Sequence, residues 1–132
     1  MASNGAPAIS VLLPVRNAED TLRETLQSLK AQTFDDFELI LVDDHSTDAS
    51  AAVAREIFSG DGRLELIESK DPGLVPALRA GTARCRGEWI ARMDGDDIAL
   101  PRRLELQHSM VTREPNLALV GCGVESFADG GL

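Results

Sequence analysis

Residues 87–97 read GEWIARMDGDD, and this stretch decides the fold. Trp89 to Met93 is a largely apolar run, which is typical of a buried strand, and Gly87 interrupts the chain just before it. The run passes directly into Asp94-Gly95-Asp96-Asp97. In open α/β sheets, ligands bind beyond the carboxyl ends of the strands, so acidic residues directly after a strand indicate a site.

Two earlier segments repeat this pattern. Ile9 to Leu13 is a continuous apolar run that ends at Pro14-Val15-Arg16-Asn17, and Phe37 to Val42 stops at Asp43-Asp44. Further strands are expected at Leu64–Ile67 and Leu117–Val120, and helices after Asn17, after Asp48, over Leu74–Arg84 and from Pro101. Because strands and helices alternate, the sequence predicts an α/β fold with a mostly parallel sheet and helices on both faces.

Two local features of the expected helices can be checked against the structure. Asn17 is a residue type that caps helix N-termini, so it is expected to cap the first helix. Ala49, Val53 and Ile57 have the spacing of one helical face and are expected to point inward from the second helix. His45 lies where the turn after the second strand needs a left-handed residue, a conformation that histidine tolerates better than most.

Length and charge limit the function. The chain has 132 residues, which suits one domain, expected over residues 9–132 with residues 1–8 as a disordered tail. With 13 Lys and Arg against 22 Asp and Glu, the net charge is −9, which argues against a nucleic-acid partner. The sequence holds no apolar run of roughly 20 residues and no signal peptide, so we expect a cytoplasmic protein without a membrane span.

The carboxylates of the Asp94–Asp97 segment are the strongest candidates for chemistry. Residues two apart on an extended segment point the same way, so Asp94 and Asp96 are expected to face one site. Two like charges at that range repel unless a cation lies near them. Oxygen ligands suit Mg²⁺ or Mn²⁺, which substrate phosphates and water usually complete. The alternative is an acidic turn that caps the next helix.

The other strand ends offer groups for a nucleotide. One carboxylate of Asp43-Asp44 is expected to face the cleft, where it can accept the N3–H of uracil or thymine but is mismatched to cytosine. Arg16 and nearby helix N–H groups can meet the base or an anion, although a solvated arginine in an ordinary turn is equally consistent. Arg79 is the candidate to reach the phosphates.

Together these segments resemble glycosyltransferase family 2, on the fold called GT-A, a Rossmann-like fold. The matching pieces are ISVLLPVRNAEDTLRETLQSL, QTFDDFELILVDDHSTD, DPGLVPALRAG and GEWIARMDGDDIALPRRLELQ. They cover nearly the whole chain from Ile9 to about Gly123 in the family's order. The combined pattern is far more specific than a single DXD motif.

The resemblance implies a role for each matching residue. Pro14 and Arg16 would line the base pocket, and Asp44 would contact the uracil. Asp94 would approach the ribose, and Asp96 would be the main metal ligand at the diphosphate. Asp97 would flank the metal and the sugar and is the candidate catalytic residue. Glu19 and Gly73 are further candidates for the cleft. Family members often have tyrosine at the position of Arg16, glycine or asparagine at that of His45, and asparagine at that of Arg79.

The implied activity is transfer of a sugar, with inversion, from a UDP- or dTDP-sugar to a hydroxyl of a saccharide or lipid-linked acceptor, as in polysaccharide biosynthesis. Family members continue well past position 132, and their acceptor site and general base lie in that later part. The domain is therefore expected to be truncated at its C-terminal side. The alternative is a donor-binding module without turnover of its own. A homodimer that covers an exposed sheet edge is a further expectation.

Overall fold

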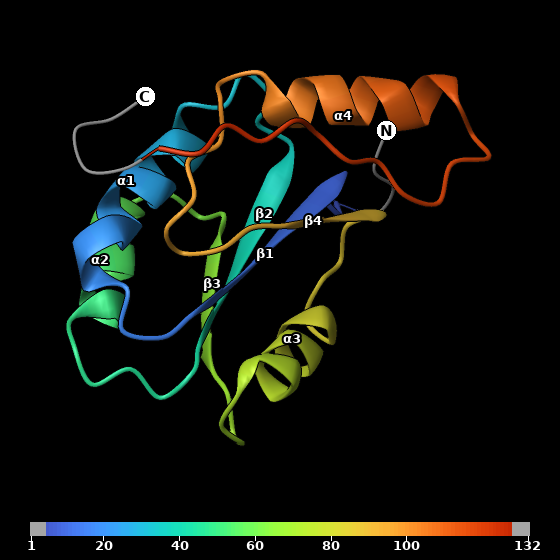
Figure 1. The fold of residues 1–132 in the computed structure, drawn as a ribbon. Coiled ribbons are helices and arrows are strands. Elements are labelled where there is room, and N and C mark those ends of the chain that lie inside the picture. Colours follow the sequence, from blue (N-terminus) through green and yellow to red (C-terminus); the bar gives the residue numbers. More distant parts are fainter. Residues whose placement is uncertain (1–4, 128–132) are drawn as a thin grey trace.

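A computed structural model describes residues 5–127 of the chain. The elements are β1 (Ile9–Val15), α1 (Glu19–Lys30), β2 (Phe37–Asp43), α2 (Ser50–Ile57), β3 (Leu64–Glu68), α3 (Leu74–Thr82), β4 (Trp89–Arg92) and α4 (Arg103–Arg113). The strands form one sheet in the order β3-β2-β1-β4, and every neighbouring pair is parallel (Figure 1). The predicted α/β fold with a parallel sheet is confirmed.

The core explains why β1 and β2 are almost wholly apolar. All seven residues of each strand are buried, because helices cover both faces of the sheet. One face packs against α1 and α2 and the other against α3 (Figure 1). On α1, Leu22, Leu26 and Leu29 are fully buried, as their helical spacing predicts.

The strand order places the candidate residues at one edge. From β1 the chain builds outward through β2 and β3, and then returns to the other side of β1 with β4. Such a reversal leaves a crevice beyond the carboxyl ends of the two strands that flank it, here β1 and β4. Asp44 follows β2 directly and donates its backbone N–H to Val15 O, while Met93 after β4 donates to Leu12 O.

The expected fifth strand at Leu117–Val120 is wrong for the part of the chain that the structure describes. This segment follows α4 without joining the sheet, and Leu119 is 85% exposed. A strand needs a neighbour for its backbone hydrogen bonds. The backbone bond recorded at its start is local, from Leu117 N–H to Glu114 O. Apolar composition alone therefore misled the prediction.

Three other expectations are modified. The inward face of α2 is rotated, because Ala49 is exposed while Ser50 and Ala54 are buried, with Val53 and Ile57 partly buried against the core. Helix α4 begins at Arg103, two residues after Pro101. Of the expected tail, residues 1–4 lie outside the described part, whereas Ala8 is buried and accepts a hydrogen bond from Trp89 N–H. No described helix is long and apolar enough to cross a membrane.

A buried polar cluster joins β1 and β2 to the connection before β4, at the edge opposite the candidate site. Glu38 of β2 accepts hydrogen bonds from Ser10 Oγ (2.6 Å), Arg86 N–H (2.7 Å) and Arg86 Nε (2.9 Å). Burial alone would raise the pKa of Glu38, but these hydrogen bonds and the Arg86 charge outweigh it and hold the pKa below its usual value. The ionised carboxylate therefore stabilises the fold.

We expect Glu38→Gln to lower the free energy of unfolding by about 1–3 kcal/mol at pH 7, because a buried charge-assisted network loses a partner. A depressed folded-state pKa contributes stability above the unfolded pKa of about 4.3, and this stability is lost as the pH falls through the folded pKa. Urea unfolding at pH 7 and near pH 3 should thus show a difference that shrinks in acid. Glu24→Gln, at an exposed glutamate of α1, is the control. An equal effect of Glu38→Gln at both pH values would contradict the argument.

Candidate functional site

The connections that follow β1 and β2 are bonded to each other. The N–H groups at the start of α1 donate to side-chain oxygens of the β2–α2 connection, in the pairs Asn17–Ser46 (3.0 Å), Ala18–Ser50 (2.9 Å) and Glu19–Asp48 (3.1 Å). In return, Ala49 N–H donates to Glu19 Oε2 (2.6 Å) and Thr47 N–H to Asn17 Oδ1 (2.7 Å). The two loops therefore form one rigid rim of the site.

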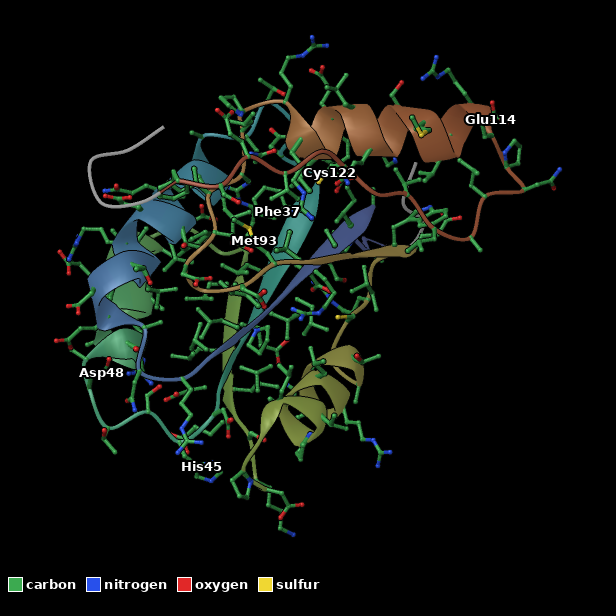
Figure 2. All side chains as sticks on the ribbon, viewed as in Figure 1. Phe37, His45, Asp48, Met93, Glu114 and Cys122 are labelled. Carbon is green, nitrogen blue, oxygen red and sulfur yellow. The ribbon has the colours of Figure 1, made fainter. Side chains whose placement is uncertain are left out.

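This exchange overturns the prediction that Asn17 caps α1. Ala18 is the N-cap residue and makes no side-chain capping bond, while Asn17 adopts a left-handed conformation with φ 50°. The orphan N–H groups of a helix start need acceptors, and here the neighbouring loop supplies them. Figure 2 shows His45 and Asp48 on that loop, far from Phe37 at the other end of β2. His45 has φ 57°, so its predicted left-handed conformation is confirmed.

Asp44 is buried and joins the rim to the start of α3. Its two carboxylate oxygens each lie 3.1 Å from Gly73 N–H, and His45 Nδ1 lies 3.1 Å from Asp44 Oδ1. The pKa of Asp44 is held below its usual value, first by the hydrogen bond with His45, then by the Gly73 N–H and the charge of Arg16, against the opposing effect of burial. Asp44 is therefore ionised near neutral pH and can only accept hydrogen bonds.

Gly73 and Asp43 support this arrangement. Gly73 has φ 110°, a conformation that side chains disfavour, and it is the N-cap residue of α3. Asp43 is also buried, and its Oδ1 accepts a hydrogen bond from Ser46 N–H (3.1 Å). Of the acidic pair, Asp43 thus shapes the turn and Asp44 bonds Gly73, and the expectation that one carboxylate faces a ligand stays a prediction.

The Asp94–Asp97 segment is a tight turn directly after β4. Asp97 N–H donates to Asp94 O (3.1 Å), which closes the turn around Gly95 and Asp96. The segment is therefore not extended, so Asp94 and Asp96 do not face one side through the alternation of side chains along a strand. A turn nevertheless keeps the carboxylates near one another. All three aspartates are exposed, whereas Gly95 is buried.

The turn lies against the connection after β1. A Cβ added to Gly95 would stand 3.0 Å from Val15 Cγ1 and 3.2 Å from Ala18 Cβ. Only a residue without a side chain fits there without displacing its neighbours. The acidic turn is therefore held beside the end of β1, at the reversal of strand order where ligands bind in such sheets.

The remaining predicted residues are placed as follows. Pro14 is buried within β1, and Arg16 is exposed on the connection that follows it. Arg79 is exposed on α3. Glu19 bonds the start of α2. The structure thus gives Glu19 and Gly73 clear roles in the scaffold of the rim, and their contact with a ligand stays a prediction.

Sequence reasoning missed the residues that hold the acidic turn and the segment after it, three of them on α1 and the fourth, Gln32, just past its end. Thr21 Oγ1 and Thr25 Oγ1 both donate to Gly95 O, at 2.8 and 3.1 Å. Ser28 Oγ accepts from Ala99 N–H (3.0 Å), and Gln32 bonds Leu100 O (2.8 Å) and Leu104 N–H (3.0 Å). The spacing of these four residues, three or four apart, marks one helical stripe beside the leucine stripe, and this signal could have identified them.

The acidic turn suits a hard divalent cation. Among the hydrogen bonds of residues 5–127, the side chains of Asp96 and Asp97 take part in none, and Asp94 Oδ1 has one long contact of 3.4 Å with Arg92. Their oxygens are therefore free to bind. No cluster of three or more His, Cys, Asp or Glu side chains with metal-binding geometry occurs in the described part. This donor set matches Mg²⁺ or Mn²⁺, which are held by one or two carboxylates together with phosphate and water.

Two hollows of the surface lie elsewhere. One of about 580 Å³ is formed by Lys30, Arg63 and their neighbours at the other edge of the sheet, and one of about 300 Å³ lies between β4 and α4. Neither is lined by Asp44, Asp94 or Asp96. The exposed carboxylates of Asp94, Asp96 and Asp97 lie instead beyond the carboxyl end of β4, and they define the candidate site.

The parallel sheet with a strand-order reversal, and with exposed carboxylates beyond β4, is that of a Rossmann-like domain of the GT-A type. A family model described as glycosyl transferase family 2 matches residues 10–132. The chain belongs to glycosyltransferase family 2. This confirms the resemblance drawn from the four sequence segments.

Relatives of known name agree with this assignment. The chain is 35% identical over 131 residues to EpsE of Bacillus subtilis (strain 168), which is provisionally named a glycosyltransferase. The matched region covers 98% of this chain and 47% of EpsE. It is 36% identical over 125 residues to the amylovoran biosynthesis glycosyltransferase AmsE of Erwinia amylovora, covering 92% of this chain and 47% of AmsE. The chain thus spans about half the length of these relatives.

Solved structures share the fold. S. aureus TarS, residues 1–349 in complex with UDP, superposes with a TM-score of 0.75 at 23% identity, covering 89% of this chain and 38% of that one. The mannosyltransferase PcManGT of Pyrobaculum calidifontis, in complex with GDP-Man and Mn²⁺, has a TM-score of 0.68 at 25% identity, covering 80% and 32%. Both similarities are consistent with the GT-A type of domain.

Proposed function

We propose that this chain is the donor-binding part of an inverting glycosyltransferase that moves a sugar from a nucleoside diphosphate to an acceptor hydroxyl. The observation that carries the proposal is the exposed Asp94–Asp97 turn, held beside β1 at the reversal of strand order. Family membership and the Mn²⁺ complex of PcManGT support a divalent cation as cofactor. The amylovoran name of AmsE supports polysaccharide synthesis and a saccharide or lipid-linked acceptor.

In this proposal the residues of the chain bind and orient the donor. Asp96, with Asp94 beside it, would hold Mn²⁺ or Mg²⁺, and Asp94 would also approach the ribose. The cation, when bound, supplies a Lewis acid that offsets the charge growing on the departing diphosphate. Asp97 lies at the end of the turn, next to where the sugar would sit. Arg16 and Arg79 are exposed cations that can approach the base and the phosphates.

Base selection would rest on Asp44. An ionised carboxylate accepts the N3–H of uracil or thymine, and repels the lone pair that cytosine presents at the same position. The depressed pKa of Asp44 keeps it in the accepting form at neutral pH. Its engagement by Gly73 N–H fixes the carboxylate in one place, which favours discrimination. We therefore propose a UDP- or dTDP-sugar as donor.

The test is calorimetric titration of UDP into the protein with and without Mn²⁺. We expect binding to be at least about 100-fold tighter with Mn²⁺, because the phosphates complete the coordination of the cation and loss of an outer-shell partner alone already costs about 10- to 100-fold. Cooperative thermal unfolding of the same sample shows that the protein is folded. If a folded sample binds UDP equally weakly with and without Mn²⁺, the metal-dependent donor site is wrong.

The choice of base is tested by titrating CDP, dTDP and GDP in the same buffer with Mn²⁺. We expect UDP and dTDP to bind, and CDP to bind at least about 100-fold more weakly, since a site built around one hydrogen bond strongly rejects a ligand that lacks the donor. GDP is included because PcManGT is complexed with GDP-Man. Equal affinity for UDP and CDP would remove Asp44 from base recognition and leave the diphosphate site intact.

A further inference from the structure

Two threonine hydroxyls of α1 converge on one carbonyl of the acidic turn. Thr21 Oγ1 lies 2.8 Å and Thr25 Oγ1 3.1 Å from Gly95 O. Each hydroxyl also has a longer contact of 3.4 Å with a carbonyl of its own helical turn. Hydroxyl hydrogen bonds are strongest near 2.7–2.8 Å, and a carbonyl oxygen accepts two donors. Both hydroxyls therefore favour Gly95.

The carbonyl they hold belongs to the peptide that joins Gly95 to Asp96. Because a peptide unit is planar, fixing its oxygen also fixes the direction in which the chain enters Asp96. On its other side Gly95 packs so closely against Val15 and Ala18 that a Cβ would lie 3.0 and 3.2 Å from their side chains. The peptide before Asp96 is thus clamped between the two threonines and the end of β1.

Two further residues of the same stripe bond the segment that follows the acidic turn. Ser28 and Gln32 bond the backbone between Ala99 and Leu104, up to the start of α4. Thr25 is 1% exposed and Gln32 9%, so these two side chains are shielded from water. The exposed carboxylates therefore lie on a loop whose backbone is bonded on one side by α1 and on the other by Ser28 of α1 and Gln32 just past its end.

We propose that Thr21 and Thr25 are positioning residues for the metal-binding carboxylates, and that they set the affinity for the cation and diphosphate without touching either. This rests on the proposed function of the Asp94–Asp97 turn. Functional groups bind best when a supporting shell holds them in place before the ligand arrives. Loss of such outer-shell partners typically lowers metal affinity about 10- to 100-fold.

The test compares three proteins with the wild type. Thr21→Val/Thr25→Val removes both hydroxyls at nearly constant volume, and Thr21→Ser/Thr25→Ser keeps them. Thr112→Val is the matched control, because within residues 5–127 the one hydrogen bond of Thr112 Oγ1 goes to the carbonyl of His108 in its own helix (2.8 Å). Thr21→Val alone, at an exposed position, serves if the double valine variant unfolds. Each is measured by NMR relaxation without ligand and by UDP titration with Mn²⁺.

In the valine variant we expect backbone order parameters at Gly95 and Asp96 to fall from about 0.85 toward 0.6, the range of flexible backbone. We expect its affinity for UDP with Mn²⁺ to fall about 10- to 100-fold, and the serine variant and Thr112→Val to stay near the wild type. Unchanged order parameters, or unchanged affinity in a valine variant that has lost them, would overturn the positioning role. If the folded wild type itself fails to bind UDP, the proposed function fails instead, and the order parameters alone decide whether the threonines hold the turn.

Discussion

Asp96→Asn is expected to abolish the Mn²⁺-dependent part of UDP binding, lowering affinity by at least about 100-fold. Asn keeps the size of the side chain and loses its charge. The cation would be held by one or two carboxylates, with phosphate and water completing its coordination shell. Removing one charged ligand therefore removes a large share of the protein's affinity for the cation. Loss of an outer-shell partner alone costs about 10- to 100-fold, so loss of a direct ligand should cost more.

The structure makes this substitution easy to interpret. Asp96 is exposed and its side chain takes part in no hydrogen bond within residues 5–127, so stability should change by less than about 0.5 kcal/mol. Asp36→Asn is the matched control, because it makes the same charge change at an exposed position before β2, at the other edge of the sheet. Calorimetry with and without Mn²⁺ gives the answer. An Asp96→Asn protein that still shows full Mn²⁺ dependence would move the cation away from this turn.

Much of the fold could be predicted because its local signals agree with its tertiary structure. Strands β1 and β2 are buried on both faces, so their sequences are almost wholly apolar. Leu22, Leu26 and Leu29 repeat at helical spacing because α1 lies on the sheet along that line. The polar strand ends stand out against these runs, which is why Asp44 and Asp94–Asp97 could be selected from the sequence.

The failures concern contacts between segments distant in sequence. Leu117–Val120 has the composition of a strand, yet pairing depends on a neighbour that composition does not reveal. Asn17 has the right chemistry for a cap, but the next loop supplies the acceptors to the helix start. The bonds of Thr21 and Thr25 with Gly95 O join residues that are 74 and 70 positions apart in sequence. Short-range patterns predict elements, and these bonds appear only once the elements are packed.

Gly87→Ala is expected to lower the free energy of unfolding by about 3 kcal/mol, at the upper end of what overpacking costs. A Cβ added to Gly87 would stand 2.6 Å from Ser10 N and 2.7 Å from Ile9 C, both backbone atoms of the buried strand β1. Gly87 N–H also donates to Ser10 Oγ (2.8 Å). The added methyl group cannot be relieved by a side-chain rotation, so β4 must move away from β1 where the two strands begin to pair.

Urea unfolding of Gly87→Ala should be compared with that of Gly62→Ala, where an added Cβ meets nothing within 4 Å. The control should stay within about 0.5 kcal/mol of the wild type or gain slightly, because alanine restricts the unfolded chain. The consequence reaches the site, since β4 leads directly into the Asp94–Asp97 turn. We therefore expect Gly87→Ala, at temperatures where it remains folded, also to weaken UDP binding with Mn²⁺. If Gly87→Ala were as stable as Gly62→Ala, β4 would not lie as close to β1 as this register requires. The position of the Asp94–Asp97 turn beside β1 would then be wrong as well.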